Sequence, residues 1–338
     1  METRMLCAEE TGIAAALLRQ GEPVGMPTET VYGLACDAYN ADAVRKVFAA
    51  KGRPADNPLI VHIADKKDWQ PLVKEIPPLA ERLAERFWPG PLTIILPKTE
   101  KIPSVTAGGL DTVGVRFPAH PVAQRMILEA GMPLAAPSGN RSGSPSPTKA
   151  KHMLDDMDGR IPAIVDGGDC LCGVESTVIS LDDENTVRVL RPGFVTPEQL
   201  QTVAEHVIVD DAVLSQLKAD TVVRSPGMKY KHYAPNAAVT LVQGDRARFL
   251  SFMGGHSGEN VFALVFDGDE AQCSEGGFTA VPYGSTDEER AAAFFARLRE
   301  LDGKGASHIY VRAPRTDGVG LAVYNRLIRA AGYDVVTL

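Results

Sequence analysis

The chain has 338 residues, of which 44% are hydrophobic and 23% are charged, and 35 Lys and Arg against 43 Asp and Glu give a formal net charge of -8. This length exceeds one ordinary core and predicts two domains, and the balanced composition excludes a disordered chain, a coiled coil and a disulfide-rich mini-protein. The acidic charge excludes non-specific coating of nucleic acid, so a polyanionic ligand must meet a local basic patch.

The cysteines and the apolar runs bear on metal binding and localisation. Cys170 and Cys172 form the closest pair among five cysteines, and a C-x-C pair without nearby histidines is a poor zinc signature. The N-terminus lacks a basic region followed by a long apolar run, and no segment approaches the roughly 20 apolar residues of a membrane span. We therefore expect a soluble, cytoplasmic protein with reduced thiols.

The first two hundred residues alternate short apolar runs with helix-like segments. A short helix is expected at 13–18, ending before Gly21. Further helices are predicted at 41–50, 78–87, 121–130 and 148–157. Strands are predicted at 58–63, 92–96, 113–117, 161–165, 177–181 and 187–190. This interleaving predicts an α/β domain, and the strands late in this half favour a mixed sheet over a purely parallel one.

A segment rich in proline, glycine, aromatic and basic residues interrupts this pattern, S-P-G-M-K-Y-K-H-Y-A-P at 225–235. Beyond it, strands are predicted at 238–242, 261–266, 308–312 and 334–338, with helices at 287–301 and 320–331. We expect domains at 1–205 and 237–338 and a linker at 206–236. Because its composition differs from that of an inert spacer, we expect 225–235 to form a lid over a bound ligand.

Several common catalytic motifs are absent from the sequence. It contains no G-x-x-x-x-G-K-[ST] phosphate loop, no G-x-G-x-x-G dinucleotide fingerprint and no H-E-x-x-H metal motif. The glycines and serine at 139–143 have the wrong spacing for a nucleophile elbow. Ser-His-Asp chemistry therefore has no support in this sequence.

Polar clusters remain at 26–34, 51–62, 111–118, 136–146 and 173–178. Each has a structural explanation by itself, such as a helix cap, a satisfied core histidine or an ion pair. Together they hold a basic set inside an acidic chain: Lys51, Arg53, Arg116, Arg141, Arg191, Lys229 and Lys231. Cations beside hydroxyl groups and backbone amides suit a polyphosphate, so the residues alone predict a phosphate- or nucleotide-handling α/β protein.

Four motifs closely resemble those of the threonylcarbamoyl-AMP synthase family, the YrdC-like proteins. They are P-T-E-T-V-Y-G-L at 27–34, K-G-R-P-x-x-N-P-L at 51–59, S-G-N at 138–140 and E-S-T-V at 175–178. The 225–235 motif followed by a second α/β domain is similar to the longer, two-domain branch. The resemblance implies a YrdC-like twisted mixed sheet with flanking helices and a smaller, Rossmann-like C-terminal domain.

The resemblance also implies a reaction. A nucleotidyltransferase of this family would join L-threonine, bicarbonate or CO2, and ATP into threonylcarbamoyl-adenylate, with release of pyrophosphate and water. Partner proteins would then transfer the threonylcarbamoyl group to adenosine next to the tRNA anticodon, and direct tRNA binding by this chain would not be required. Mg²⁺ would accompany ATP, with no metal ligand from protein side chains and no organic prosthetic group.

The same resemblance assigns the site residues. The catalytic set would be Lys51, Arg53, Ser138 and Asn140. Threonine would be held by Thr30, His62, Arg116, Ala136 and Ser176. ATP would be held by Arg53, Asn57, Thr112, Ser138, Ser146, Arg191 and Tyr233. Arg116 would take the threonine carboxylate through two hydrogen bonds, and His62 would orient the amine or help to deprotonate it.

Two other functions compete with this one. Stand-alone relatives of the first domain have been linked to RNA binding, so an RNA-binding or ribosome-assembly module is the main alternative, although the acidic charge weighs against it. Carbamoyl transfer, as in hydrogenase-maturation proteins, is a third, but those proteins carry zinc-finger motifs and no C-x-x-C occurs here. The role of the second domain, the oligomeric state, the carbon donor and the stringency for threonine over serine stay open.

Overall fold

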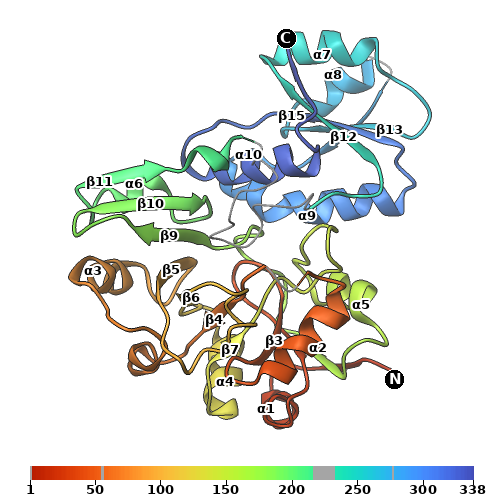
Figure 1. Ribbon diagram of the computed structural model, residues 1–338. Helices are drawn as coiled ribbons and strands as arrows, with labels where there is room; N and C mark the ends of the chain where they lie inside the picture. The colour runs from red at the N-terminus through yellow and green to blue at the C-terminus, as the bar shows by residue number, and fades with distance from the viewer. Residues whose placement is uncertain (1, 55–56, 216–232, 276–277) are drawn as a thin grey trace. The chain divides into compact units, whose positions relative to one another are not determined.

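The computed structural model describes residues 2–54, 57–215, 233–275 and 278–338 (Figure 1). The chain divides into two compact units. The first contains Met1–Ser142 and Ser146–Lys229, and the second contains Gly143–Pro145 and Tyr230–Leu338. Every helix within the described ranges is too short or too polar to span a lipid bilayer.

The first unit is built on a mixed sheet, which has 11 strands in the described part of the chain (Figure 1). Their spatial order is β1 (Arg4–Leu6), β8 (Ala163–Val165), β2 (Val24–Met26), β3 (Gly33–Asp37), β7 (Leu134–Ala135), β4 (Ile60–His62), β6 (Thr112–Arg116), β5 (Leu92–Pro97), β9 (Thr177–Leu181), β10 (Thr186–Arg191) and β11 (His206–Val209). Parallel and antiparallel pairs alternate irregularly, as in β4 with β6 and β6 with β5. The predicted mixed α/β sheet is confirmed.

Helices cover both faces of this sheet. They are α1 (Thr11–Arg19), α2 (Ala41–Lys51), α3 (Pro78–Phe87), α4 (Pro121–Ala130), α5 (Ala150–Met157) and α6 (Pro197–Leu200), with short 3-10 turns η1 (Lys66–Asp68), η2 (Gln70–Leu72) and η3 (Asp211–Val213). Helices α1 and α4 share one apolar cluster with β2 and β7, whereas α2, α3 and α5 share the other with β4 and β6. Asn40 caps α2 and Gly52 ends it with a left-handed backbone, so the chain turns sharply just after Lys51.

The predicted elements of this unit are largely present. Helices at 78–87 and 121–130 have the expected bounds, and the predicted strand at 177–181 is β9. The strand expected at 58–63 is shorter, as β4. Strand β11 lies inside the stretch expected to be a linker and pairs with β10.

The second unit is a smaller parallel α/β domain, as the resemblance implied. In the residues that the structure describes, its five strands run in the order β14 (Thr279–Pro282), β13 (Val261–Val265), β15 (His308–Arg312), β12 (Ala238–Gln243) and β16 (Val335–Thr337). Its helices are α7 (Arg246–Gly254), α8 (Glu270–Glu275), α9 (Asp287–Gly303) and α10 (Gly318–Ala330). Helix α9 begins with a capping box formed by Thr286 and Glu289, which satisfies backbone N–H groups of its first turn.

Candidate active site

Four neighbouring strands present a row of side chains to one face of the first sheet. His62 of β4 lies opposite Arg116 of β6, Arg116 lies opposite Thr93 of β5, and Thr93 lies opposite Val178 of β9. Paired residues of adjacent strands point to the same face, and the alternate residue Val115 lies in the core behind. The register therefore places a cation, an imidazole and a hydroxyl side by side.

Arg116 is the centre of this row and is almost fully buried, with 3% of its surface exposed. Its Nη1 donates to Thr30 Oγ1 at 2.9 Å, its Nε donates to the Gly90 carbonyl at 3.3 Å, and its Nη2 lies 2.7 Å from Glu29 Oε1. Burial favours the neutral form of Glu29, but the Arg116 guanidinium holds its pKa below the ordinary value. The site therefore contains a buried, ionised pair.

His62 is buried beside this pair. Burial, followed by the positive charge of Arg116, lowers the pKa of His62 to about 3. The imidazole is therefore neutral at physiological pH, and its Nδ1 makes no hydrogen bond within the described part of the chain. So low a pKa makes His62 a weak proton acceptor, so the structure favours orientation of a ligand over its deprotonation.

Ser176 joins the row to a second arginine. Its hydroxyl lies 2.8 Å from Thr93 Oγ1 and accepts from Arg191 Nη2 at 3.1 Å, while its carbonyl accepts from Arg191 Nε at 3.0 Å. All three side chains are buried. Arg191, expected at ATP, and Ser176, expected at threonine, are thus in direct contact.

Lys51 connects the K-x-R and S-x-N motifs. Its Nζ donates to the Ser138 carbonyl and, at 2.6 Å, to the Asn140 carbonyl, and its own carbonyl accepts from Ser142 N at 2.9 Å. Burial, aided by the nearby Arg53, lowers the pKa of Lys51 well below its ordinary value. In this structure Lys51 holds the 138–142 loop through backbone carbonyls.

The other nucleotide candidates surround this loop. Arg53 Nη2 donates to the carbonyls of Asn57 and Pro58 at 3.4 and 3.3 Å. Ser146 is fully buried and donates to Glu175 Oε1 at 2.5 Å. Glu175 precedes Ser176 in the chain, so this contact ties the loop of Ser146 to the row described above.

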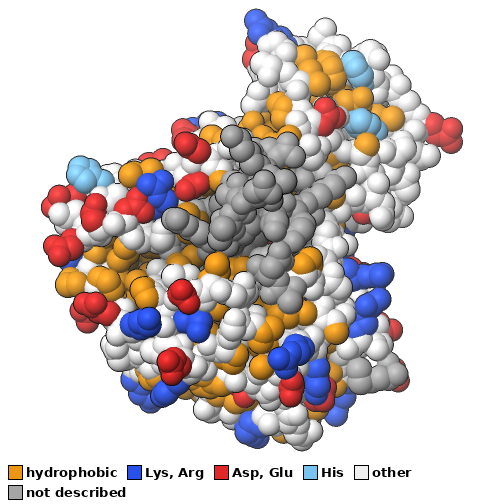
Figure 2. All heavy atoms as spheres, in the orientation of Figure 1, with side chains coloured by type: hydrophobic (Ala, Val, Ile, Leu, Met, Phe, Trp, Pro, Cys, Tyr) orange, Lys and Arg blue, Asp and Glu red, His pale blue; other side chains and the backbone are white. Residues whose placement is uncertain are grey.

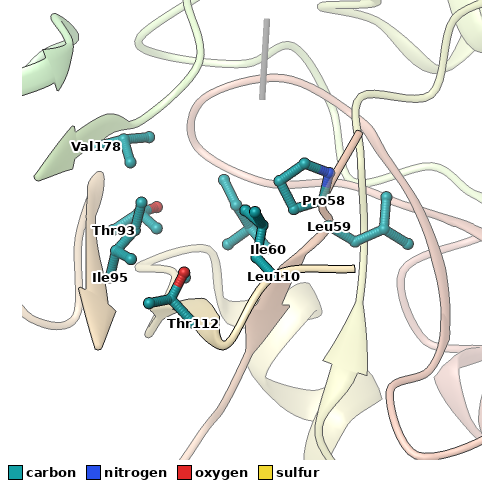
Figure 3. A pocket seen from close by; sticks show the side chains of 9 residues that line it. Pro58, Leu59, Ile60, Thr93, Ile95, Leu110, Thr112 and Val178 are labelled. Atoms are coloured by element: carbon teal, nitrogen blue, oxygen red, sulfur yellow. The ribbon is translucent and has the colours of Figure 1, made fainter. Parts of the chain in front are cut away.

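A small hollow lies beside Thr93 and Val178 of this row (Figure 3). It is lined by Pro58, Leu59, Ile60, Thr93, Ile95, Leu110, Thr112, Gly114 and Val178. Figure 3 shows Thr93 and Ile95 of β5 on one side and Ile60 and Pro58 on the other.

Gly114 explains why space exists at this place. It lies in the middle of β6, opposite Ile60 and Ile95, two residues before Arg116. A Cβ atom at this position would come within 3.0 Å of Thr93 Cγ2. A glycine inside a strand often marks the close approach of a ligand, and Thr112, expected at ATP, lines the same hollow.

The chain has close relatives among proteins of established name. Residues 16–193 match the family model described as "Telomere recombination", and residues 195–332 match the model of the C-terminal domain of threonylcarbamoyl-AMP synthase. The threonylcarbamoyl-AMP synthase of Pyrococcus abyssi is 45% identical over 333 residues, a match that covers 96% of this chain and 94% of the relative. The chain belongs to the threonylcarbamoyl-AMP synthase family.

Other members and solved structures agree with this assignment. The threonylcarbamoyl-AMP synthase of Bacillus subtilis is 46% identical over 327 residues, covering 96% of this chain and 93% of the relative. The crystal structure of P. abyssi Sua5 complexed with L-threonine has a TM-score of 0.91 at 41% identity and covers 99% of this chain and 100% of that chain. Escherichia coli YciO, at 22% identity and a TM-score of 0.50, covers 56% of this chain and 96% of that chain and supports the fold alone.

The structure brings most of the residues expected from the threonylcarbamoyl-AMP synthase family to one sheet face and its adjoining loops. Ala136 N donates to the Ile60 carbonyl at 2.9 Å, which places Ala136 at the edge of β4. Tyr233 belongs to the second unit, where its ring lies 5.3 Å from that of Phe295. Residues 225–232 of the lid expected at 225–235 lie outside the described ranges, so the lid and the contact of Tyr233 with ATP stay predictions.

The sequence interpretation gave no role to four residues of this face: Glu29, Thr93, Gly114 and Glu175. For two of them, the sequence contains a pattern that could have indicated a functional role. Glu29 stands between two threonines in the P-T-E-T motif, and Gly114 interrupts an apolar strand, where glycine is unfavourable unless space is needed.

Proposed function

We propose that this chain makes threonylcarbamoyl-AMP from L-threonine, CO2 or bicarbonate, and ATP, with release of pyrophosphate. The observation that carries the proposal is the position of Arg116 in β6, two residues after Gly114 and opposite Thr93, both of which line the hollow. A cation that suits an amino-acid carboxylate thus adjoins a space bordered by Thr112. Family membership, and the relative that was solved with L-threonine, support the same assignment.

Threonine binds first at the Arg116 row. The guanidinium takes the carboxylate, and the neutral His62 and the hydroxyls of Thr30 and Ser176 offer hydrogen bonds to the rest of the amino acid. Because these groups are buried, each hydrogen bond to the ligand is stronger than it would be in water.

The α-ammonium of the bound threonine loses one proton to solvent. The resulting neutral amine attacks the carbon of CO2, which forms the N–C bond of a carbamate and releases a second proton. A carbamate oxygen attacks the α-phosphorus of ATP, and the bond to pyrophosphate breaks. When bicarbonate is the donor, its dehydration supplies the CO2 and one water. The two products are threonylcarbamoyl-adenylate and pyrophosphate.

This chain's own residues position the phosphates. Lys51 fixes the 138–142 loop so that Ser138 and Asn140 face ATP, and Arg53, beside Pro58 at the rim of the hollow, stabilises charge on the phosphoryl oxygens. Mg²⁺ enters with ATP as part of the substrate. No group of three or more His, Cys, Asp and Glu that could hold a metal ion occurs among the described residues.

The product passes to proteins that transfer the threonylcarbamoyl group to tRNA, and direct tRNA binding by this chain is not required. Positive and negative side chains are intermingled over the first unit on the face that Figure 2 shows. Such a surface suits a small polyanion in a local site better than a long RNA backbone.

Pyrophosphate release from ATP and bicarbonate, measured with and without L-threonine, tests the proposed function. We expect release that depends on threonine and a product with the mass of threonylcarbamoyl-AMP. Pyrophosphate release at the same rate with and without threonine contradicts the proposal. Salt-dependent tRNA binding without any ATP consumption would favour the RNA-binding alternative instead.

A further inference from the structure

The buried Arg116–Glu29 pair is the feature that the assigned roles leave unexplained. Both side chains are more than nine-tenths buried, and their closest charged atoms are 2.7 Å apart. A buried ion pair adds little net stability, because both charges lose their water. Its presence at the proposed threonine site therefore calls for a role in binding.

Arg116 has enough donors to serve two carboxylates. A guanidinium carries five N–H groups. In this structure, single contacts go to the Gly90 carbonyl, the Thr30 hydroxyl and the Glu29 carboxylate. The remaining N–H groups can receive a substrate carboxylate while Glu29 stays in place.

The side chains around Glu29 suit its carboxylate to binding a cation. His62 beside it is neutral, and burial raises the pKa values of the nearby Cys170 and Cys172 thiols, so these are neutral as well. The backbone of Glu29 is fixed by the hydrogen bond from Cys172 N to its carbonyl, at 2.8 Å. Its carboxylate thus has a defined position beside Arg116.

An α-amino acid carries its two charges on neighbouring atoms of one carbon. If Arg116 takes the carboxylate, the ammonium must lie within a few ångströms of the same guanidinium, which is where Glu29 stands. We propose that Glu29 is a specificity residue that binds the α-ammonium of L-threonine while Arg116 binds the carboxylate. The two charges of the ion pair then match the two opposite charges of zwitterionic threonine. This inference rests on the proposed function and assigns no proton transfer to Glu29.

A purely structural role makes a different prediction. If Glu29 only positions Arg116, its removal weakens every carboxylate ligand alike. If it binds the ammonium, its removal weakens only ligands that have one. L-threonine and (R)-3-hydroxybutyrate, which is threonine without its amino group, separate the two cases.

The test is titration calorimetry of both ligands on the full chain, on Glu29→Gln and on the control Glu85→Gln, which removes an exposed carboxylate from α3. We expect Glu29→Gln to raise the Kd of threonine by about 30-fold, the strength of a charge-assisted hydrogen bond, and to leave the Kd of hydroxybutyrate unchanged. The control should bind both ligands as the unaltered chain does.

Equal losses for the two ligands, or an unchanged threonine Kd, overturn the inference while the proposed function stands. An unaltered chain that binds no threonine overturns both. The unaltered chain also gives a measurement that does not depend on the folding of a variant. It should bind threonine at least about 30-fold more tightly than hydroxybutyrate, and equal affinity would overturn the role of Glu29. Glu29→Asp, which keeps the charge, should recover part of the preference for threonine.

Discussion

Both units bury arginine–carboxylate pairs, but the pairs have different surroundings. In the second unit, Asp287 contacts Arg290 at 2.7 Å and Arg315 at 3.1 Å, so that one carboxylate serves two arginines. The guanidinium of Arg290 also lies over the ring of Phe266, 3.7 Å from its centre. The charge of Arg290 is therefore stabilised both by the Asp287 carboxylate and by the face of an aromatic ring.

The neighbouring pair in the same unit repeats this arrangement. Asp269 contacts Arg246 at 2.6 Å and Arg312 at 2.5 Å, and Arg312 lies 4.4 Å from the centre of the Phe266 ring. Together the two carboxylates and the ring tie the ends of β13 and β15 to helices α7 and α9. Such an arrangement is typical of a structural clamp.

The pair in the first unit has a different setting. Arg116 meets a single carboxylate, next to a histidine whose Nδ1 has no hydrogen-bond partner among the described residues and next to the hollow at Gly114. Unused hydrogen-bonding capacity beside open space is what a ligand site requires. The comparison shows that the groups around a buried ion pair, and not the pair itself, distinguish a binding site from a structural contact.

The largest expected effect comes from Arg116→Ala. It removes the proposed partner of the threonine carboxylate and leaves Glu29 as a buried charge without Arg116, so we expect threonine-dependent pyrophosphate release to fall by about 10³-fold. Arg116→Lys should restore little, because an ammonium group cannot reproduce the several directed contacts of a guanidinium. Near-normal activity of Arg116→Ala would remove the basis for placing the amino-acid site at this row.

The second expected effect tests the clamp. Asp287→Asn leaves Arg290 and Arg315 without their shared charge and should lower the free energy of unfolding by about 3 kcal/mol, measured by urea denaturation and circular dichroism. Asp317→Asn is the matched control, because Asp317 contacts the same Arg315 at 3.3 Å but is 64% exposed, and its loss should cost about 0.5 kcal/mol or less. Threonine affinity should not change in either variant, and a change with Asp287→Asn would contradict a purely structural role.

The helices and strands of the first unit show which parts of the fold can be predicted from the sequence alone. Helices α3 and α4 were predicted with their bounds because their apolar residues recur at helical spacing and prolines mark their first turns. Strand β7 was missed, since two residues are too few to show a period. Such strands form because tertiary neighbours on both sides complete their hydrogen bonds.

The site was predicted by motif and not by geometry. Thr30, His62 and Arg116 entered through the resemblance to a family, and the structure then placed them in contact or in register. Glu29 could not be given a role from the sequence, because its function depends on Arg116, 87 positions further along the chain. The sheet register that brings them together is a property of the whole fold.

The smallest expected effect distinguishes the proposed ATP part of the site from the proposed threonine part. Gly114→Val would place side-chain atoms in the hollow between Ile60 and Ile95, where even a Cβ lies 3.0 Å from Thr93 Cγ2. Overfilling of this kind costs about 1–3 kcal/mol, which predicts a rise of about 5- to 150-fold in the KM for ATP. Threonine is proposed to contact the neighbouring row, so its Kd measured by calorimetry should change much less. Gly114→Ala should give an intermediate KM. If the KM for ATP stays normal while threonine binding fails, the hollow belongs to the amino acid and the division between the two halves is wrong.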